Sequence, residues 1–156
     1  MRITVVAIGT RMPKWVDDGV RDYLKRLPRH LELSFKELPA AQRGGKTSVE
    51  KQKQKEGEQM LKALPQHGYT IALDERGKQH SSEGWAQQLE HWLAEYPQVN
   101  FLIGGADGLA VACREQADAV WSLSGMTLPH ALVRVVLAEQ IYRAWTLTQG
   151  HPYHRE

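Results

Sequence analysis

The sequence has little cysteine and no long apolar run. Its single cysteine, Cys113, excludes a disulfide within the chain and a zinc site made of several cysteines, and it fits a reducing compartment. No run approaches the roughly 20 apolar residues of a membrane-spanning helix. The apolar run at residues 2–8 is short and has no clear cleavage site, so we expect no signal peptide and a cytoplasmic protein.

Several motifs that carry chemistry are also missing. The sequence has no G-x-x-x-x-G-K-[ST] phosphate loop and no G-x-S-x-G nucleophile turn, and the glycines at 104, 105 and 108 do not form the dinucleotide fingerprint. His130, His151 and His154 lack a cysteine or an acidic residue at a recognised ligand spacing. We therefore expect no metal site.

The chain is weakly basic, with 20 Lys and Arg against 18 Asp and Glu and a formal net charge of +2. Two groups of basic residues stand out: Arg21, Lys25, Arg26 and Arg29, and further on Arg43, Lys46, Lys51, Lys53 and Lys55. Either group could contact phosphates. The alternative is an ordinary solvated surface, and the interspersed acids Glu50, Glu56 and Glu58 favour it.

Strand-like and helix-like patterns alternate along the 156 residues. The expected strands are residues 2–8, 31–38, 70–74, 99–103 and 120–123, and the expected helices are 13–26, 48–63, 82–95, 109–118 and 130–147. A polar loop should fill residues 39–47, and a turn should follow Asp74 at residues 75–78. This alternation predicts a single α/β domain over residues 1–156 with a mostly parallel sheet.

Two loops of small residues each follow an expected strand and precede an expected helix, at residues 104–108 and 124–129. Ligands bind at such places in open α/β sheets, and glycine lets the main chain approach a flat ligand closely. Tight turns also use glycine for purely local reasons, but two such loops after neighbouring strands are better evidence than one.

The expected last helix is apolar around most of its circumference. Between residues 131 and 145 only Arg134, Glu139, Gln140 and Arg143 are strongly polar. A helix of this kind needs cover on several sides, and a two-fold symmetric dimer would supply it. The alternative is burial between the sheet and a neighbouring helix. Glu139 and Arg143 are four residues apart in the favourable order for an ion pair.

The tail, residues 151–156, reads His-Pro-Tyr-His-Arg-Glu, five hydrogen-bonding side chains in a place that is usually disposable. Together with the two loops it indicates an enzyme.

Several segments together resemble a known family. They are Val6-Ala7-Ile8-Gly9-Thr10, Lys55-Glu56-Gly57-Glu58, Leu73-Asp74-x-x-Gly77-Lys78, Leu102-Ile103-Gly104-Gly105, Leu128-Pro129-His130, Leu137-x-Glu139-Gln140-x-Tyr142-Arg143-Ala144 and His151-Pro152-Tyr153-His154. Over its full length the chain resembles the ribosomal large-subunit methyltransferase H family of the SPOUT class. That family usually has Gly-Gly-Pro-Glu-Gly where this chain has Ala106 and Asp107, a departure that should affect cofactor affinity first.

The resemblance implies a trefoil knot in the C-terminal part, a homodimer, and methylation of N3 of a pseudouridine in helix 69 of 23S rRNA, on the assembled ribosome. It also implies S-adenosyl-L-methionine as the methyl donor. The implied cofactor residues are Leu73, Gly105, Ser124, Gly125, Met126, Thr127, Leu128 and Pro129.

The candidate catalytic residues are His154, Arg155, Tyr153, Glu139 and Arg143. The N3–H proton must be removed or the forming anion stabilised; His154 or Glu139 could accept the proton, and either arginine could stabilise the charge. Tyr153 could stack on the base, and the tail of one subunit could complete the site of the other. Two alternatives stay open: an RNA-binding module of the ribosome without catalysis, and an enzyme acting on a small nucleotide.

Overall fold

Strands and helices alternate in the computed structural model, which describes residues 1–42 and 48–155. The strands are β1 (Arg2–Ile8), β2 (Glu32–Leu38), β3 (Tyr69–Gln79), β4 (Gln98–Ile103) and β5 (Ala119–Ser122). The helices are α1 (Lys14–Arg26), α2 (Val49–Ala63), α3 (Ser82–Glu95), α4 (Val111–Gln116), α5 (His130–Thr148) and the 3-10 helix η1 (Pro152–Arg155). Arg43, Lys46 and Glu156 lie outside the described residues, as does most of the glycine-containing part of the expected polar loop.

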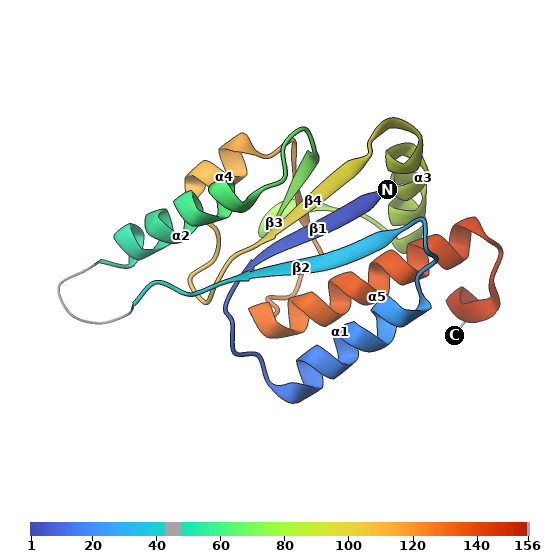
Figure 1. Cartoon of the computed structure of the whole chain (residues 1–156), viewed down its shortest axis with the longest axis horizontal. Helices are drawn as coiled ribbons and strands as arrows, with labels where there is room; N and C mark the ends of the chain where they lie inside the picture. The colour runs from blue at the N-terminus through green and yellow to red at the C-terminus, as the bar shows by residue number, and fades with distance from the viewer. Residues whose placement is uncertain (43–47, 156) are drawn as a thin grey trace.

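The five strands form one parallel sheet in the order β2-β1-β4-β3-β5. Helices α1 and α5 lie against one face of the sheet, and α2 and α4 lie against the other (Figure 1). Parallel strands covered on both faces are apolar along their length, and β1 accordingly buries all of its residues after Arg2. The expected α/β domain with a parallel sheet is confirmed.

The core has one layer on each side of the sheet. Because successive side chains of a strand point to opposite faces, Val5 of β1 belongs to the layer under α3 and α5, and Val6 belongs to the layer under α2 and α4. The aromatic residues Trp92 and Phe101 fill the first layer with ring centroids 5.9 Å apart. The single cysteine, Cys113, is fully buried in the second layer.

Two expected boundaries are wrong. Strand β3 does not end in a turn after Asp74 but continues to Gln79, with an irregularity after which Lys78 again pairs with Trp121. Gly77 makes this possible, since a Cβ there would lie 2.6 Å from the Trp121 carbonyl carbon. Helix α4 covers six residues instead of 109–118, because the backbone is extended on both sides of it, at Ala110 and Ala117.

Helix α5 connects the two ends of the molecule. It begins near the carboxyl ends of the strands and ends beside η1, at the end where β1 starts (Figure 1). At 1.5 Å per residue, its 19 residues span about 28 Å. Among the helices of residues 1–42 and 48–155, none is long and apolar enough to cross a membrane.

Candidate active site

A cavity of about 690 Å³ lies at the carboxyl ends of β3, β4 and β5. It is lined by residues 73–76 of β3, by the segment 103–109 after β4, by most of the segment 122–130 after β5, and by Lys53 and Val133. Ligands in open parallel sheets bind at this edge, and the volume is typical of a small-molecule site.

The first loop closes tightly on itself. The Gly108 amide donates to the Gly105 carbonyl at 3.0 Å, and the two residues form an isolated antiparallel bridge. A Cβ on Gly104 would lie 2.5 Å from the Gly108 carbonyl carbon, and Gly108 has a φ of +84°. The glycines are therefore needed for the turn itself, which also brings the main chain of Gly105 to the cavity wall.

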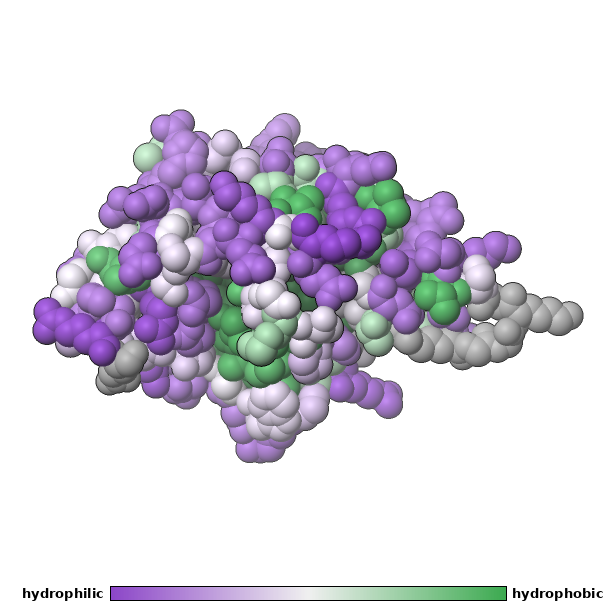
Figure 2. Space-filling model, turned by 180° about the vertical axis from the view of Figure 1, so that it is seen from behind, coloured by the Kyte–Doolittle hydropathy of each residue, from purple (hydrophilic) through white to green (hydrophobic). Residues whose placement is uncertain are grey.

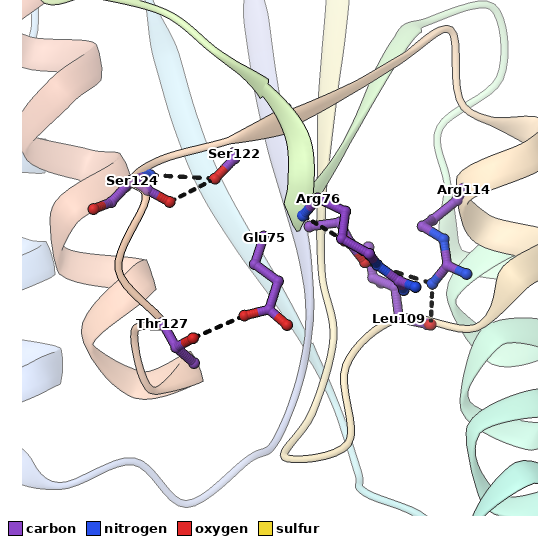
Figure 3. Close-up of polar contacts among 8 residues, drawn as sticks. Glu75, Arg76, Leu109, Arg114, Ser122, Ser124 and Thr127 are labelled. Carbon is purple, nitrogen blue, oxygen red and sulfur yellow. Dashed lines mark hydrogen bonds and ion pairs between the residues drawn. The ribbon is translucent and has the colours of Figure 1, made fainter.

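The second loop is held in place by short side chains (Figure 3). The Ser122 hydroxyl donates to the Ser124 carbonyl at 2.8 Å, and the Met126 amide donates to the Ser124 hydroxyl at 3.0 Å. The Thr127 hydroxyl donates to the Glu75 carboxylate at 2.9 Å and thereby ties this loop to β3. The chain's own contacts thus hold the loop in shape, which lowers the ordering cost of binding.

Asp74 ties the rim of the cavity to α4. Its carboxylate accepts from the Arg76 amide at 2.9 Å and from Arg76 Nε at 3.2 Å, and Arg114 Nη1 lies 3.5 Å away. Burial opposes ionisation, but the hydrogen bonds and charge of Arg76, with the charge of Arg114, lower the pKa of Asp74. Arg114 also donates to the Leu109 carbonyl at 3.0 Å (Figure 3). Asp74 is thus an ionised structural group.

The structure brings most of the expected cofactor residues together. Leu73, Gly105, Ser124, Met126, Thr127, Leu128 and Pro129 line the cavity. Gly125 does not; a Cβ there would instead lie 3.5 Å from Gln79 Nε2. Sequence reasoning missed Lys53 and Val133, which reach the cavity from α2 and α5 and carry no local signal in the sequence.

A second polar cluster joins the tail to α1 and α5. The Tyr153 hydroxyl donates to Glu139 Oε1 at 3.2 Å and lies 3.4 Å from the Tyr23 hydroxyl. Arg143 Nη2 lies 2.7 Å from the same Glu139 oxygen, which confirms the expected ion pair. Burial, the hydrogen bond with Tyr23 and the negative charge of Glu139 raise the pKa of Tyr153. The phenol therefore keeps its proton, and the cluster presents a paired carboxylate and guanidinium.

Aromatic contacts hold the tail in the same place. The Tyr153 ring packs edge-on against Tyr142, with centroids 4.6 Å apart, and Arg143 lies over the Tyr153 ring at 5.1 Å. His154 is half-buried, and its Nδ1 is buried without a hydrogen-bond partner among the residues described. Arg155 is exposed.

The structure does not bring the candidate catalytic residues to the cavity of the same chain. Glu139 and Arg143 follow His130 by nine and 13 residues on one helix, or about 13 and 20 Å along its axis. His130 lines the cavity, whereas the tail packs at the opposite end of α5 (Figure 1). Within one chain the cavity and the candidate catalytic residues are therefore separate.

The described part of the chain holds no group of three or more His, Cys, Asp or Glu side chains that could bind a metal ion.

Comparison with known proteins adds an independent finding. A family model described as "predicted SPOUT methyltransferase" matches residues 1–154. Three similar proteins share the name ribosomal RNA large subunit methyltransferase H. The chain is 48% identical over 155 residues to the one from Marinomonas sp. (strain MWYL1) and 51% identical over 155 residues to the one from Saccharophagus degradans. It is 47% identical over 156 residues to the one from Thioalkalivibrio sulfidiphilus. The alignments cover 99% or 100% of this chain and 100% of each relative.

A solved structure, a probable methylase family protein from Haemophilus influenzae Rd KW20, superposes with a TM-score of 0.56 at 12% identity. The superposition covers 97% of this chain and 69% of that one. At this identity the likeness concerns the fold alone.

Proposed function

The chain belongs to the SPOUT methyltransferase family, and from this premise we propose that it methylates RNA of the large ribosomal subunit in the cytoplasm. The proposed target is N3 of a pseudouridine in helix 69 of 23S rRNA, and the assembled ribosome is the proposed substrate. The observation that carries the proposal is the cavity of about 690 Å³ at the ends of three parallel strands.

The cavity fits S-adenosyl-L-methionine as the methyl donor. This compound, when bound, supplies an electrophilic methyl group on a positively charged sulfur and carries no phosphate. The lining combines Leu73, Ile103 and Leu128 with main chain at Gly104 and Gly105, which suits a nucleoside. Glu75 also lies in the lining and gives it a carboxylate to face a cation.

The chain's own residues would position the base and handle its proton. Glu139 or His154 would accept the N3 proton of the pseudouridine, and Arg143 or Arg155 would stabilise the anion as it forms. Tyr153, which keeps its proton, would orient Glu139 or stack on the base. Holding the nitrogen in line with the methyl group would supply much of the rate enhancement.

These roles require a homodimer in which the tail and α5 of one subunit complete the cavity of the other. Two features support this arrangement. The candidate catalytic groups lie far from the cavity of their own chain, and the apolar residues Leu132, Val135 and Val136 of α5 are only half-buried. Figure 2 shows apolar surface gathered in a recess between polar side chains, and such exposed patches mark binding surfaces.

Mass spectrometry of rRNA incubated with the protein and isotope-labelled S-adenosyl-L-methionine tests the proposed function. We expect one labelled methyl group on a helix 69 pseudouridine, with higher yield on 70S ribosomes than on 50S subunits or naked rRNA. Label found only in small molecules would indicate a nucleotide-modifying enzyme. A chain that binds ribosomes but gives no calorimetric signal with the donor would be a binding module without catalysis.

A further inference from the structure

The basic excess of the chain is concentrated on α1 and its flanks. Residues 9–30 contain six basic and three acidic residues, a net charge of +3, compared with +2 for the whole chain. The six basic residues, Arg11, Lys14, Arg21, Lys25, Arg26 and Arg29, are all exposed. The rest of the chain therefore has a slight acidic excess, so this segment alone gives the protein its positive charge.

Spacing puts most of these cations on the solvent side of α1. Lys14, Arg21 and Lys25 are separated by seven and four residues, which places them on one face of a helix, opposite the buried Val16. Arg21, Lys25 and Arg29 form no ion pair within the described residues, whereas Arg26 pairs with Asp22 at 2.9 Å and belongs to the tail cluster. Arg21 and Lys25 on this side, and Arg29 beyond the end of the helix, are thus available to phosphates.

Three exposed acidic residues, Asp17, Asp18 and Asp22, share α1 with these cations, and two of them are already paired. Asp18 is engaged by Lys14 at 2.9 Å in an exposed pair, and this hydrogen bond, together with the charges of Lys14, Arg21 and Lys25, lowers the pKa of Asp18. An exposed pair of this kind is weak, so a phosphate can compete for the lysine.

An exposed tryptophan stands at the start of the same helix. Trp15 is 57% exposed, although a tryptophan usually buries most of its surface. It lies one residue after Lys14 and four after Arg11, whose side chains are exposed. An indole beside guanidinium and ammonium groups is the arrangement on which unpaired bases stack in single-stranded RNA.

This surface begins next to the mouth of the cavity. Arg134 of α5 donates to the Gly9 carbonyl at 2.8 Å and to the Ile8 carbonyl at 3.1 Å, which holds the β1–α1 connection against α5. A Cβ on Gly9 would lie 3.6 Å from His130 Cε1, and His130 lines the cavity. The connection that leads to Arg11 and Trp15 therefore starts beside His130, at the rim of the cavity.

We infer that the solvent face of α1 and the preceding connection form the RNA-binding surface of this protein. Arg11, Lys14, Arg21, Lys25 and Arg29 contact phosphates, and Trp15 stacks on an unpaired base next to the methylated one. The inference rests on the proposed function, since it takes rRNA as the substrate, and it adds the residues that recognise it.

The outer face of α2 is the competing surface and provides a matched control. Lys51, Lys55 and Lys62 are exposed and also share one helix face by spacing. Residues 48–64 contain four lysines and three glutamates, a net charge of only +1. We therefore expect α2 to contribute little to RNA binding.

The experiment compares three variants with the unmodified chain: Trp15→Ala, the triple variant Arg21→Gln, Lys25→Gln, Arg29→Gln, and the control Lys51→Gln, Lys55→Gln, Lys62→Gln. Cosedimentation with unmethylated 70S ribosomes at several salt concentrations gives the affinity, and methyl transfer gives KM and kcat.

Each lost phosphate contact should lower the magnitude of the slope of log affinity against log salt by about one, so in the α1 triple variant this slope should fall by about three. Trp15→Ala should weaken ribosome binding roughly tenfold. In both α1 variants KM should rise while donor binding stays unchanged.

Each outcome decides the inference. Equal effects of the α1 and α2 triple variants would overturn it while leaving the proposed function intact. A shift of Trp15→Ala to a smaller mass in sedimentation velocity would assign the surface to a second copy of the chain and would also overturn it. If the chain binds ribosomes without transferring a methyl group, and the α1 variants lose this binding, the proposed function would be rejected and the RNA-binding surface would be supported. A chain that does not bind ribosomes would reject both.

Discussion

Asp74 illustrates how one carboxylate stabilises the cavity rim. We predict that Asp74→Asn lowers the free energy of unfolding by about 1 kcal/mol at neutral pH. The effect is modest because Arg76 is exposed, which limits how much the Asp74–Arg76 ion pair stabilises the fold. The folded-state pKa of Asp74 is depressed, so its contribution is present above the ordinary value of 3.8 and is lost as pH falls through the folded-state pKa.

Urea unfolding of both proteins at neutral and strongly acidic pH measures this effect. The difference between the native chain and Asp74→Asn should shrink under acidic conditions. A difference that stays constant would show that the carboxylate charge is irrelevant there.

Ala106 occupies the second position of the turn closed by Gly105 and Gly108, a position that favours proline. We predict that Ala106→Pro stabilises the fold by about 0.4–1 kcal/mol and tightens donor binding a few-fold by restricting the free loop. Calorimetry with S-adenosyl-L-methionine and urea unfolding measure the two effects. Ala106→Gly is the control and should change both quantities in the opposite direction.

At the scale of elements, the second part of β3 depends on the absence of a side chain at residue 77. We predict that Gly77→Ala destabilises the protein by about 2 kcal/mol or more, since the strand must move away from the main chain of Trp121. Gly84→Ala is the matched control: its Cβ would lie 3.4 Å or more from its neighbours, and alanine favours α3. Thermal unfolding of the two variants should give opposite shifts, and equal shifts would refute the explanation.

The tail forms the other decisive element. We predict that deletion of residues 151–156 abolishes methyl transfer but leaves donor binding largely intact, because none of the tail residues 151–155 that the structure describes lines the cavity. Activity assays and calorimetry on the same preparation separate the two effects. Tyr153→Phe, which keeps the ring but loses the hydrogen bond to Glu139, should retain more activity than the deletion. Unchanged turnover by the truncated chain would remove the tail from the mechanism.

Most elements are predictable because their signals are local. The run at residues 2–8 is apolar and β-branched, and Ser48 caps α2 as expected by accepting from the Lys51 amide at 3.2 Å. The continuation of β3 is not predictable in this way, because Gly77 followed by Lys78 has the composition of a turn. Its strand character comes from pairing with Trp121, which is distant in sequence.

The candidate site, too, is predictable only where its signals are local. The two loops could be identified because small residues and glycines follow apolar strands. The place of the tail could not, because nothing local shows that Tyr153 returns to Tyr23 and Glu139 instead of reaching the cavity. The homodimer and the knot that the resemblance implies depend on a second chain and on chain threading, and both stay predictions.

At the scale of the whole molecule, mixing two inactive variants tests the shared site. One is the tail deletion, and the other is Ala106→Trp, in which a large ring at an exposed lining position fills the cavity. Subunit exchange should turn about half of the dimers into heterodimers. Each heterodimer has one intact cavity facing one intact tail, so about a quarter of all sites should recover activity. If cavity and tail acted within one chain, the mixture would stay inactive.

Calorimetry on Ala106→Trp alone should show no donor binding, and the mass in solution should be twice the 17.7 kDa of one chain. A monomer with full activity would exclude the shared site.

The buried Cys113 can report on local opening of the folded protein. Its sulfur lies 3.7 Å from the Gly57 carbonyl, between α2 and α4, and burial raises the pKa of its thiol. Because it is the sole cysteine, alkylation of the native protein can proceed only when that helical layer separates from the sheet. The rate of alkylation then measures how often the structure opens beside the cavity. A cysteine introduced on the surface can carry a fluorophore with little competition from the native thiol.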